Sequence, residues 1–213
     1  MDIVCIADTH GRHDRLRIPA GDVLVHAGDF TEAGEPGEID LFLDWLAALP
    51  YDRKVFIGGN HEFYIEEHAA YFVEQVQGIP GIVYLQDSGV EIDGVKFWGS
   101  PVSPRYYDWA FNRARGPEIR AHWDLIPSDV NVLVTHCPPA EIGDLNHAGR
   151  HEGCADLRAA VGRLPQLQLH VFGHIHTGFC VYRDGGVTFV NAAVLTDNYA
   201  VRQEPAFTFK YEA

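Results

Sequence analysis

The stretch Gly58-Gly59-Asn60-His61-Glu62 decides the interpretation of this chain. It follows the apolar run Val55-Phe56-Ile57 and precedes residues 64–77, which have the pattern of a helix. Two glycines after a buried strand allow a sharp turn and a close approach to a ligand. Open α/β sheets place their sites at the carboxyl ends of strands, so Asn60 and His61 are expected in a site. The simpler alternative is a strand–helix turn with Asn60 as the helix N-cap.

Length and composition predict one globular domain that covers residues 1–213. Of the 213 residues, 46% are hydrophobic and 22% are charged, which is ordinary for a globular protein. No apolar run approaches the ~18 residues of a membrane span. The N-terminus lacks the pattern of a signal peptide. We therefore expect a cytoplasmic protein without a membrane partner.

The net charge and the cysteines indicate which partners to exclude and whether disulfides are expected. The net charge of −14 argues against a nucleic-acid polymer as partner, because nucleic-acid binders concentrate Lys and Arg. If the substrate carries phosphate, metal ions must attract it. The four cysteines form no C-x-x-C pair, so reduced and mostly buried thiols are expected. The sequence leaves the oligomeric state open.

Strand and helix patterns alternate along the chain. Strands are expected at residues 3–7, 23–25, 54–57, 82–85, 89–92, 95–98, 132–134, 169–172, 179–182, 187–190 and 206–211. Helices are expected at residues 39–49, 64–77, 118–123 and 154–164. Asp93-Gly94 has the form of a hairpin turn, and the last three strands suggest an antiparallel meander. This order predicts two packed sheets with helices outside.

Five of the apolar strand runs end in polar side chains. The clusters are Asp8/His10, Asp29, Asn60/His61, His136 and His174/His176. Parallel strands would bring these ends to one edge, where so many polar groups are costly to bury without a partner. Imidazole with carboxylate suits Fe, Mn, Zn or Ni. Each motif alone has an ordinary alternative, such as a turn or a hydrogen-bonded histidine, but the five together indicate a metal site.

These motifs resemble the signature of the calcineurin-like metallophosphoesterases, D-x-H, G-D, G-N-H-[DE], H and G-H-x-H, which is complete here. The chain is most similar to the metallophosphoesterase-domain-containing proteins of vertebrate brain and their bacterial relatives. Trp98-Gly99-Ser100-Pro101 and Thr135-His136-Cys137-Pro138-Pro139 are among the supporting stretches. The resemblance implies an α/β fold, a four-layer α/β/β/α sandwich of two mixed sheets.

The resemblance also implies roles for the site residues. One divalent ion would take Asp8, His10 and His176, and a second would take Asn60, His136 and His174, with Asp29 bridging both. His61 stays off the metals and would protonate the leaving oxygen. Glu32 lies where relatives carry an acid that orients this histidine. Manganese is expected to support turnover in vitro, with Fe, Zn or Ni as other candidates.

The implied activity is metal-dependent hydrolysis of small phosphodiesters, such as 2′,3′-cyclic nucleotides. Ser/Thr phosphatases of the superfamily have Arg directly after the acid at position 32, whereas this chain has Ala33. Protein phosphatase activity is therefore not expected. The alternatives are a phosphomonoesterase or pyrophosphatase with the same metals, and a non-catalytic scaffold of the same fold. The complete ligand set and His61 argue against the scaffold.

Candidate substrate contacts are Asn60, His61, Asp144, Arg150 and Asn191. Asp144 and Arg150 belong to a polar loop, residues 140–152, that could equally be an ordinary surface loop. Asn191 is expected near the metals, because relatives have Asn after the corresponding strand.

The aromatic residues of the loop 100–116 have two interpretations. They could stack a nucleobase, or they could pack the loop against the protein. His26 and His170 lie within strands and are expected as hydrogen-bonded core histidines.

Overall fold

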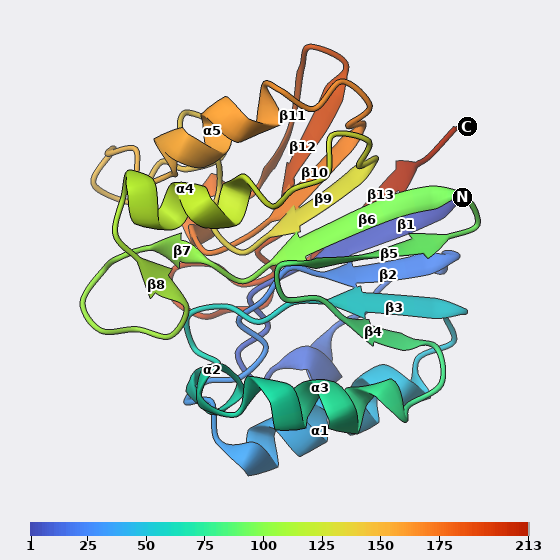
Figure 1. Cartoon of the computed structure of the whole chain (residues 1–213). Helices are drawn as coiled ribbons and strands as arrows, with labels where there is room; N and C mark the ends of the chain where they lie inside the picture. Colours follow the sequence, from blue (N-terminus) through green and yellow to red (C-terminus); the bar gives the residue numbers. More distant parts are fainter. Residues whose placement is uncertain (213) are drawn as a thin grey trace.

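Two stacked β-sheets form the centre of the computed structural model, which describes residues 1–212 (Figure 1). The first sheet holds, in order, β13 (Phe207–Lys210), β1 (Asp2–Ile6), β2 (Val23–His26), β3 (Arg53–Phe56) and β4 (Ile82–Tyr84). The second holds β11 (Cys180–Asp184), β12 (Val187–Asn191), β10 (Leu169–Phe172), β9 (Val132–Thr135), β6 (Val95–Ser100) and β5 (Ser88–Ile92). A short pair, β7 (Ser103–Pro104) and β8 (Asn112–Arg113), lies in the loop after β6.

Helices cover both outer faces of this pair of sheets. The helices are α1 (Pro36–Ala48), α2 (Phe63–Glu67), α3 (Ala69–Gln77), α4 (Pro117–Trp123) and α5 (Ala155–Val161), with short 3₁₀ turns η1 (His13–Arg15) and η2 (His176–Gly178). The first three lie on the first sheet, and α4 and α5 lie on the second (Figure 1). The predicted four-layer sandwich is therefore confirmed. No helix among residues 1–212 combines the length and apolarity needed to cross a membrane.

Most neighbouring strands run parallel, and only the edge strands β13, β11 and β5 pair antiparallel. Parallel strands covered on both faces need apolar side chains on both faces. In β1, Ile3 and Cys5 point between the sheets, while Val4 and Ile6 point towards the helices. This explains why the strand patterns of the sequence are continuous apolar runs and do not alternate.

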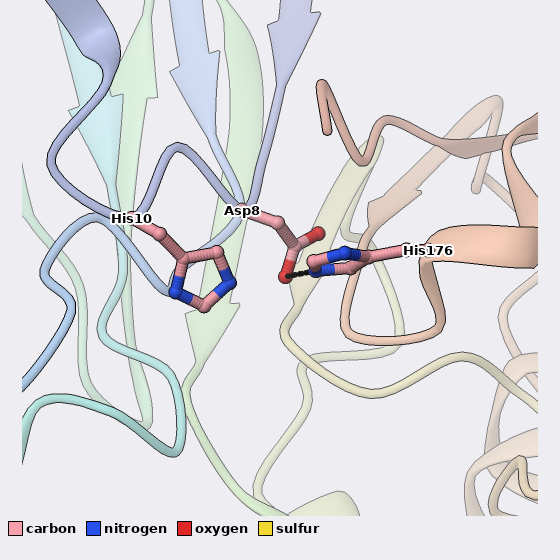
Figure 2. A group of neighbouring side chains, drawn as sticks. All are labelled: Asp8, His10 and His176. Atoms are coloured by element: carbon pink, nitrogen blue, oxygen red, sulfur yellow. Dashed lines mark ion pairs between the residues drawn. The ribbon is translucent and has the colours of Figure 1, made fainter. Parts of the chain in front are cut away.

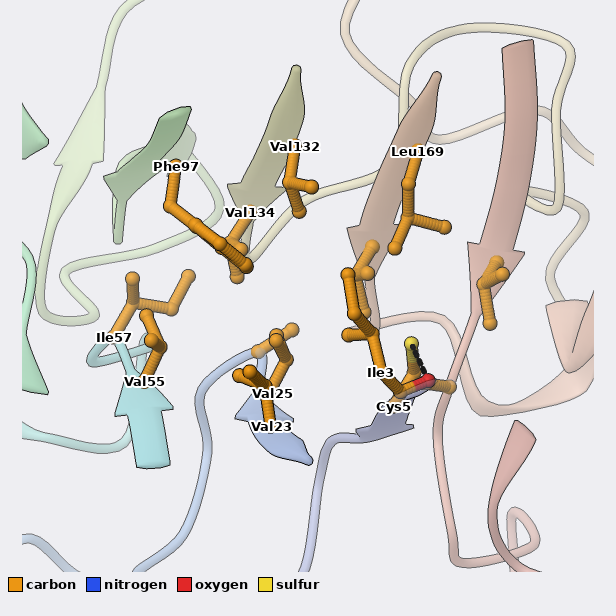
Figure 3. Close-up of a cluster of buried hydrophobic side chains, with 14 of the residues drawn as sticks. Ile3, Cys5, Val23, Val25, Val55, Ile57, Phe97, Val132, Val134 and Leu169 are labelled. Carbon is orange, nitrogen blue, oxygen red and sulfur yellow. Dashed lines mark hydrogen bonds between the residues drawn. The ribbon is translucent and has the colours of Figure 1, made fainter. Parts of the chain in front are cut away.

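The inner faces of the two sheets form the main core. Val25 and Val55 of the first sheet face Val134 and Leu169 of the second, and all four are at most 1% exposed (Figure 3). Burying one such side chain contributes about 1.5–3 kcal/mol. This dry layer fixes the separation of the sheets, and it therefore fixes how close the loops of one sheet come to those of the other.

The start of α1 follows from its local sequence. Pro36 occupies the first turn, and Glu35 and Glu38 form a reciprocal capping box with the main chain. Ile39, Phe42 and Leu46 then form the buried face of the helix. These signals extend the helix three residues before the predicted start at residue 39.

Two sequence predictions are corrected by the structure. Of the antiparallel meander expected in the tail, only the pair β11–β12 forms, because β13 crosses to pair with β1 in the other sheet. The single helix expected at residues 64–77 is split into α2 and α3 at His68, which has φ −124° and ψ 33°. The hairpin at Asp93-Gly94 is confirmed, with φ of 50° and 80° between β5 and β6.

His26 and His170 are core histidines, as expected. The Nε2 of His26 lies 3.1 Å from the hydroxyl of Thr9, and that of His170 lies 2.8 Å from the hydroxyl of Thr135. Burial is the main reason why the pKa of each histidine falls to about 3. Both rings are therefore neutral in the folded protein at neutral pH.

The neutral core histidines predict acid sensitivity. Unfolded histidine titrates near pH 6.5, so between pH 6.5 and about 3 the unfolded chain binds a proton that folded His170 does not. The contribution of neutral His170 to the free energy of unfolding is fully present above pH 6.5 and is lost as the pH falls towards 3. The free energy of unfolding in urea should fall between pH 7 and pH 5 in both proteins. It should fall less in His170→Gln than in the wild type, by up to about 1.4 kcal/mol per pH unit. Equal pH dependence in both proteins would contradict a neutral His170.

Candidate metal centre

The seven expected ligands meet in one site between the two sheets. Loops after β1, β2 and β3 bring Asp8, His10, Asp29 and Asn60 from the first sheet, and loops after β9 and β10 bring His136, His174 and His176 from the second. The two sheets are joined next to the site, because Ala7 receives a hydrogen bond from Val194 and donates one to Ala192. The convergence therefore depends on the stacking of two sheets and not on neighbouring strands alone.

The backbone is strained at several of these ligands. Asp8, His10, Asp29 and His174 have φ of 55°, 41°, 54° and 68°. Residues other than glycine seldom adopt this left-handed backbone region, and such conformations persist only where the surrounding structure holds them. The strain aims the four side chains at the centre of the site.

Three of the histidines are oriented by main-chain carbonyl groups. In each, Nδ1 lies against a carbonyl oxygen: Thr31 for His10 at 3.2 Å, Ala27 for His136 at 3.0 Å, and Thr196 for His176 at 3.3 Å. A carbonyl oxygen only accepts, so Nδ1 carries a hydrogen and Nε2 is the nitrogen that can bind a metal ion. Metal-binding histidines use this arrangement, which fixes the ring and the tautomer.

The free ring nitrogens surround two carboxylates. Oδ2 of Asp29 lies 3.2 Å from Nε2 of His136 and 3.9 Å from Nε2 of His10. Figure 2 shows the rings of His10 and His176 around the Asp8 carboxylate, with Nε2 of His176 3.8 Å from Oδ1. The main-chain N–H of His174 donates to both oxygens of Asp8 at 3.0 Å. Asp8 therefore links the two sheets as well as facing the site.

The protonation states of His10, His174 and Asp29 match those of metal ligands, whereas that of His136 does not. Burial lowers the pKa of His10 and of His174 to about 4, which leaves both neutral at neutral pH. Burial opposes ionisation of Asp29, but the charge and hydrogen bond of His136 hold the pKa of this carboxyl well below its usual range. Burial likewise disfavours protonation of His136, yet Asp29 raises its pKa to about 9. In the protein without metal, His136 thus holds a proton that a bound cation would displace.

The donor set fits divalent metal ions. Nε2 of His10 is buried without a hydrogen-bond partner in the described part of the chain. Ligand atoms lie within 4.8 Å of one another in three groups, Asp8/His10/His176, His10/Asp29/His61 and Asp29/His136/His174. Oδ1 of Asn60 lies 2.9 Å from Nε2 of His136 and can join the third group. Buried lone pairs of this kind are satisfied by a cation.

Glu62 is a site residue for which the sequence analysis assigned no role. Its side chain is fully buried, and its two carboxylate oxygens accept four hydrogen bonds. The donors are the main-chain N–H groups of Asp29, Thr31 and Gly59 and the hydroxyl of Thr31. Burial, and then the Asp29 charge, raise the pKa of Glu62 to about 7. A cation beside Asp29 would relieve that repulsion.

The expected role of Glu32 needs correction. Nδ1 of His61 lies 2.7 Å from the main-chain carbonyl oxygen of Glu32, whereas the Glu32 carboxylate lies 3.7 Å from Arg12 and is 64% exposed. The carbonyl, not the predicted acid, orients the imidazole. Position 32 is thus important for its backbone, which any residue supplies.

Three candidate substrate contacts are directed elsewhere. Asp144 is buried and accepts from Glu141 N, Gly153 N and His151 Nδ1. Asn191 is buried and donates to the carbonyl groups of Gly143 and Ile175. Arg150 is exposed, with Nε 3.7 Å from Glu152. Asp144 and Asn191 hold the loop 140–152 in place, and neither lines the cavity above the site.

A cavity of about 570 Å³ opens over the expected metal ligands. Asn60 and His61 line it, as expected for substrate contacts. The other lining residues are His10, Asp29, Tyr106, Trp109, Asn112, Asn146, His147, His174, Ile175, His176, Thr177, Asp197, Asn198 and Tyr199. The loop 140–152, which could border the substrate or be an ordinary surface loop, contributes Asn146 and His147 to the cavity. Residues 197–199 had no predicted role, because this loop segment carries no recognisable motif.

Comparison with known proteins identifies the family. The model of the calcineurin-like phosphoesterases matches residues 1–178, and the chain belongs to this family of hydrolases. Metallophosphoesterase domain-containing protein 1 from Homo sapiens is 43% identical over 217 residues, which cover 92% of this chain and 67% of that protein. UPF0046 protein T07D4.2 from Caenorhabditis elegans is 36% identical, covering 95% of this chain and 58% of that protein. The family and the clustered ligands together support divalent metal binding.

Solved structures share the fold at low sequence identity. The protein TT1561 of Thermus thermophilus superposes with a TM-score of 0.62 at 12% identity, covering 90% of this chain and 88% of that one. A second crystal structure gives a TM-score of 0.66 at 17% identity over 90% of both chains. These similarities support the architecture alone.

Gly173 provides a test of the close packing behind the ligands. A Cβ atom at this position would overlap the Asp8 carboxylate and lie 2.6 Å from Cβ of Ala7. Gly173→Ala should therefore displace Asp8 and lower the bound metal by at least half, as measured by elemental analysis after dialysis. Gly37→Ala is the matched control, because Gly37 lies in α1 with nothing within 4 Å of the added atom. Full metal content in Gly173→Ala would contradict a role for Asp8 as ligand.

Proposed function

We propose that this protein hydrolyses small phosphodiesters with two divalent metal ions. The observation that carries the proposal is the charge of the cavity. Among its lining residues, all within residues 1–212, there is no Lys or Arg, whereas Asp29 and Asp197 are both present. Monoesters and pyrophosphates bring two or more negative charges, which proteins usually bind with Arg or Lys. A diester brings one charge, which the metal ions alone can balance.

The ligand assignment follows the geometry of the site. Asp8, His10 and His176 would hold one ion, and Asn60, His136 and His174 the other, with Asp29 between them. When bound, divalent ions polarise phosphoryl oxygens and lower the pKa of water towards neutrality. Manganese is the metal expected to support turnover in vitro, and Fe, Zn or Ni also suit these ligands.

His61 is the proposed proton donor. Its Nδ1 donates to the carbonyl oxygen of Glu32, so Nε2 is the nitrogen that can exchange a proton with the substrate. Nε2 lies 4.0 Å from Oδ2 of Asp29, and the ring lines the cavity. His61 would give the Nε2 proton to the leaving oxygen, a role that contributes typically 10²–10⁴ in rate.

The cavity suits a small-molecule substrate. Its volume of about 570 Å³ falls within the usual range of small-molecule sites. A nucleic-acid polymer is not the proposed substrate, because the net charge of −14 would repel it. The resemblance to metallophosphoesterase-domain-containing proteins makes 2′,3′-cyclic nucleotides the first natural diesters to test.

Comparing esters tests the proposed substrate class. With Mn²⁺, kcat/KM for bis-p-nitrophenyl phosphate and for 2′,3′-cyclic AMP should exceed that for p-nitrophenyl phosphate by at least tenfold, because the monoester carries an extra charge. Faster hydrolysis of the monoester would favour a phosphomonoesterase. A metal-loaded protein that cleaves no ester would favour a non-catalytic scaffold.

Two substitutions separate metal binding from proton donation. Asp29→Asn should lose metal and activity together, because it removes the central carboxylate. His61→Gln should keep the metal and lose 10²–10⁴ in kcat. Exposed His68 serves as the control, and His68→Gln should behave as the wild type. Normal turnover in His61→Gln would exclude His61 as the acid.

A further inference from the structure

One wall of the cavity is aromatic and belongs to a single loop. Trp109 and Tyr106 line the cavity and come from the loop that we call the aromatic loop, residues 103–113. The Trp109 ring centroid lies 4.6 Å from that of His61, with 39° between the ring planes. Trp109 is 36% exposed and Tyr106 is 65% exposed. Both rings therefore offer apolar surface next to the proposed proton donor.

The aromatic loop is tied directly to the metal-ligand loop. The N–H of Ala110 donates to the carbonyl oxygen of Asn60 at 3.1 Å. Glu66 of α2 accepts from the N–H of Phe111 at 2.8 Å and from the guanidinium of Arg113 at 3.0 Å. These three hydrogen bonds fix the backbone that follows Trp109, so Trp109 is held in place before any ligand binds. Preorganised rings lose little entropy on binding.

A different residue of this loop accounts for its packing. Phe111 is 1% exposed and belongs to the core under α1, α2 and α3. Its ring lies so close to Gly58 that an added Cβ there would be 3.1 Å from Cε2. Phe111 thus anchors the loop in the core. Trp109 also packs on Phe63, and Tyr106 on Tyr107, yet both keep an exposed part of the ring at the cavity.

The position of His61 indicates which part of a substrate meets this wall. If His61 protonates the leaving oxygen at Nε2, the group attached to that oxygen must lie beside His61. Two rings pack on His61 at the cavity, that of the expected ligand His10 and that of Trp109. Another aromatic lining residue, Tyr199, packs on His10 and His176, with ring centroids 5.1 Å and 5.5 Å apart. Trp109 is therefore the aromatic side chain beside His61 that is free to meet the leaving group.

We propose that Trp109, with Tyr106, forms a subsite for a flat aromatic ring on the leaving group, and that Trp109 determines specificity for such esters. This inference rests on the proposed function for the assignment of the ring to the leaving group. Stacking of one ring on an aromatic side chain contributes about 1–3 kcal/mol and needs no particular hydrogen bond. The subsite therefore selects a planar ring and not one particular molecule.

Kinetic comparison of two diesters tests the subsite. Bis-p-nitrophenyl phosphate has an aromatic leaving group, and glycerophosphoethanolamine has none. Trp109→Leu should lower kcat/KM for the aryl diester about tenfold, leave the glycerol diester within twofold, and leave the metal content unchanged. Trp109→Phe should restore most of the loss. An equal loss on both diesters would mean that Trp109 only positions His61, and no loss on either would also overturn the proposal.

A matched control lies on the same loop. Asp108 is exposed and does not line the cavity. Asp108→Ala should leave both diesters unaffected, so it separates loss of the subsite from general disturbance of the loop. Tyr106→Leu is a second test that does not alter the packing on His61, and it should reduce hydrolysis of the aryl diester selectively.

A binding measurement separates this inference from the proposed function. In titration calorimetry with Mn²⁺-loaded protein, phenylphosphonate should bind about tenfold more tightly than methylphosphonate, and Trp109→Leu should abolish the preference. Should the wild type cleave no diester yet show this preference, the proposed function fails and the subsite stands. Should it cleave diesters without any preference for the phenyl ligand, the subsite is wrong and the proposed function stands.

Discussion

The buried carboxylate of Glu62 holds together the two loops at the centre of the site. It accepts from the main chain of Asp29 and Thr31 after β2 and from Gly59 after β3, with distances between 2.6 and 3.0 Å. The hydroxyl of Thr31 adds a fourth bond. A buried carboxyl group that accepts four hydrogen bonds fixes its surroundings, since any displacement leaves buried donors unsatisfied. The position of Asp29 therefore depends on a residue that does not line the cavity.

A similar principle joins the two sheets. The Nδ1 of His136 from the second sheet lies against the carbonyl oxygen of Ala27 in the first, and Asp8 of the first sheet accepts from His174 N of the second. Each contact orients a ligand and ties the layers together in the same bond. Folding and assembly of the site are thus one process, because the stacked core brings together loops that neither sheet could organise alone.

Much of this arrangement could be predicted from the sequence. Continuous apolar runs marked the buried parallel strands, and the polar residues at their ends marked the ligands, since both signals are local. Strand pairings between distant parts of the chain were harder to predict. Nothing in residues 206–211 indicates that β13 pairs with β1 rather than with its neighbours in the sequence.

The surroundings of the ligands show the same limit. Glu62 follows His61 in the quoted motif, but its acceptor role depends on main-chain N–H groups about 30 residues away. The contact of His61 with Glu32 runs through a carbonyl group, which the side-chain pattern does not encode. Asn146, His147 and Tyr199 reach the cavity only because of how their loops fold. Side chains placed by strand ends were predictable, whereas those placed by loop conformation were not.

The central claim is that carbonyl-bound histidines direct their Nε2 atoms at a pair of cations on either side of Asp29. Anomalous diffraction from crystals grown with Mn²⁺ tests this claim most directly. Two anomalous peaks are expected, one beside Asp8, His10 and His176 and one beside Asn60, His136 and His174, with Asp29 in contact with both. Peaks at other groups, contact through Nδ1, or no bound ion near Asp29 would contradict it.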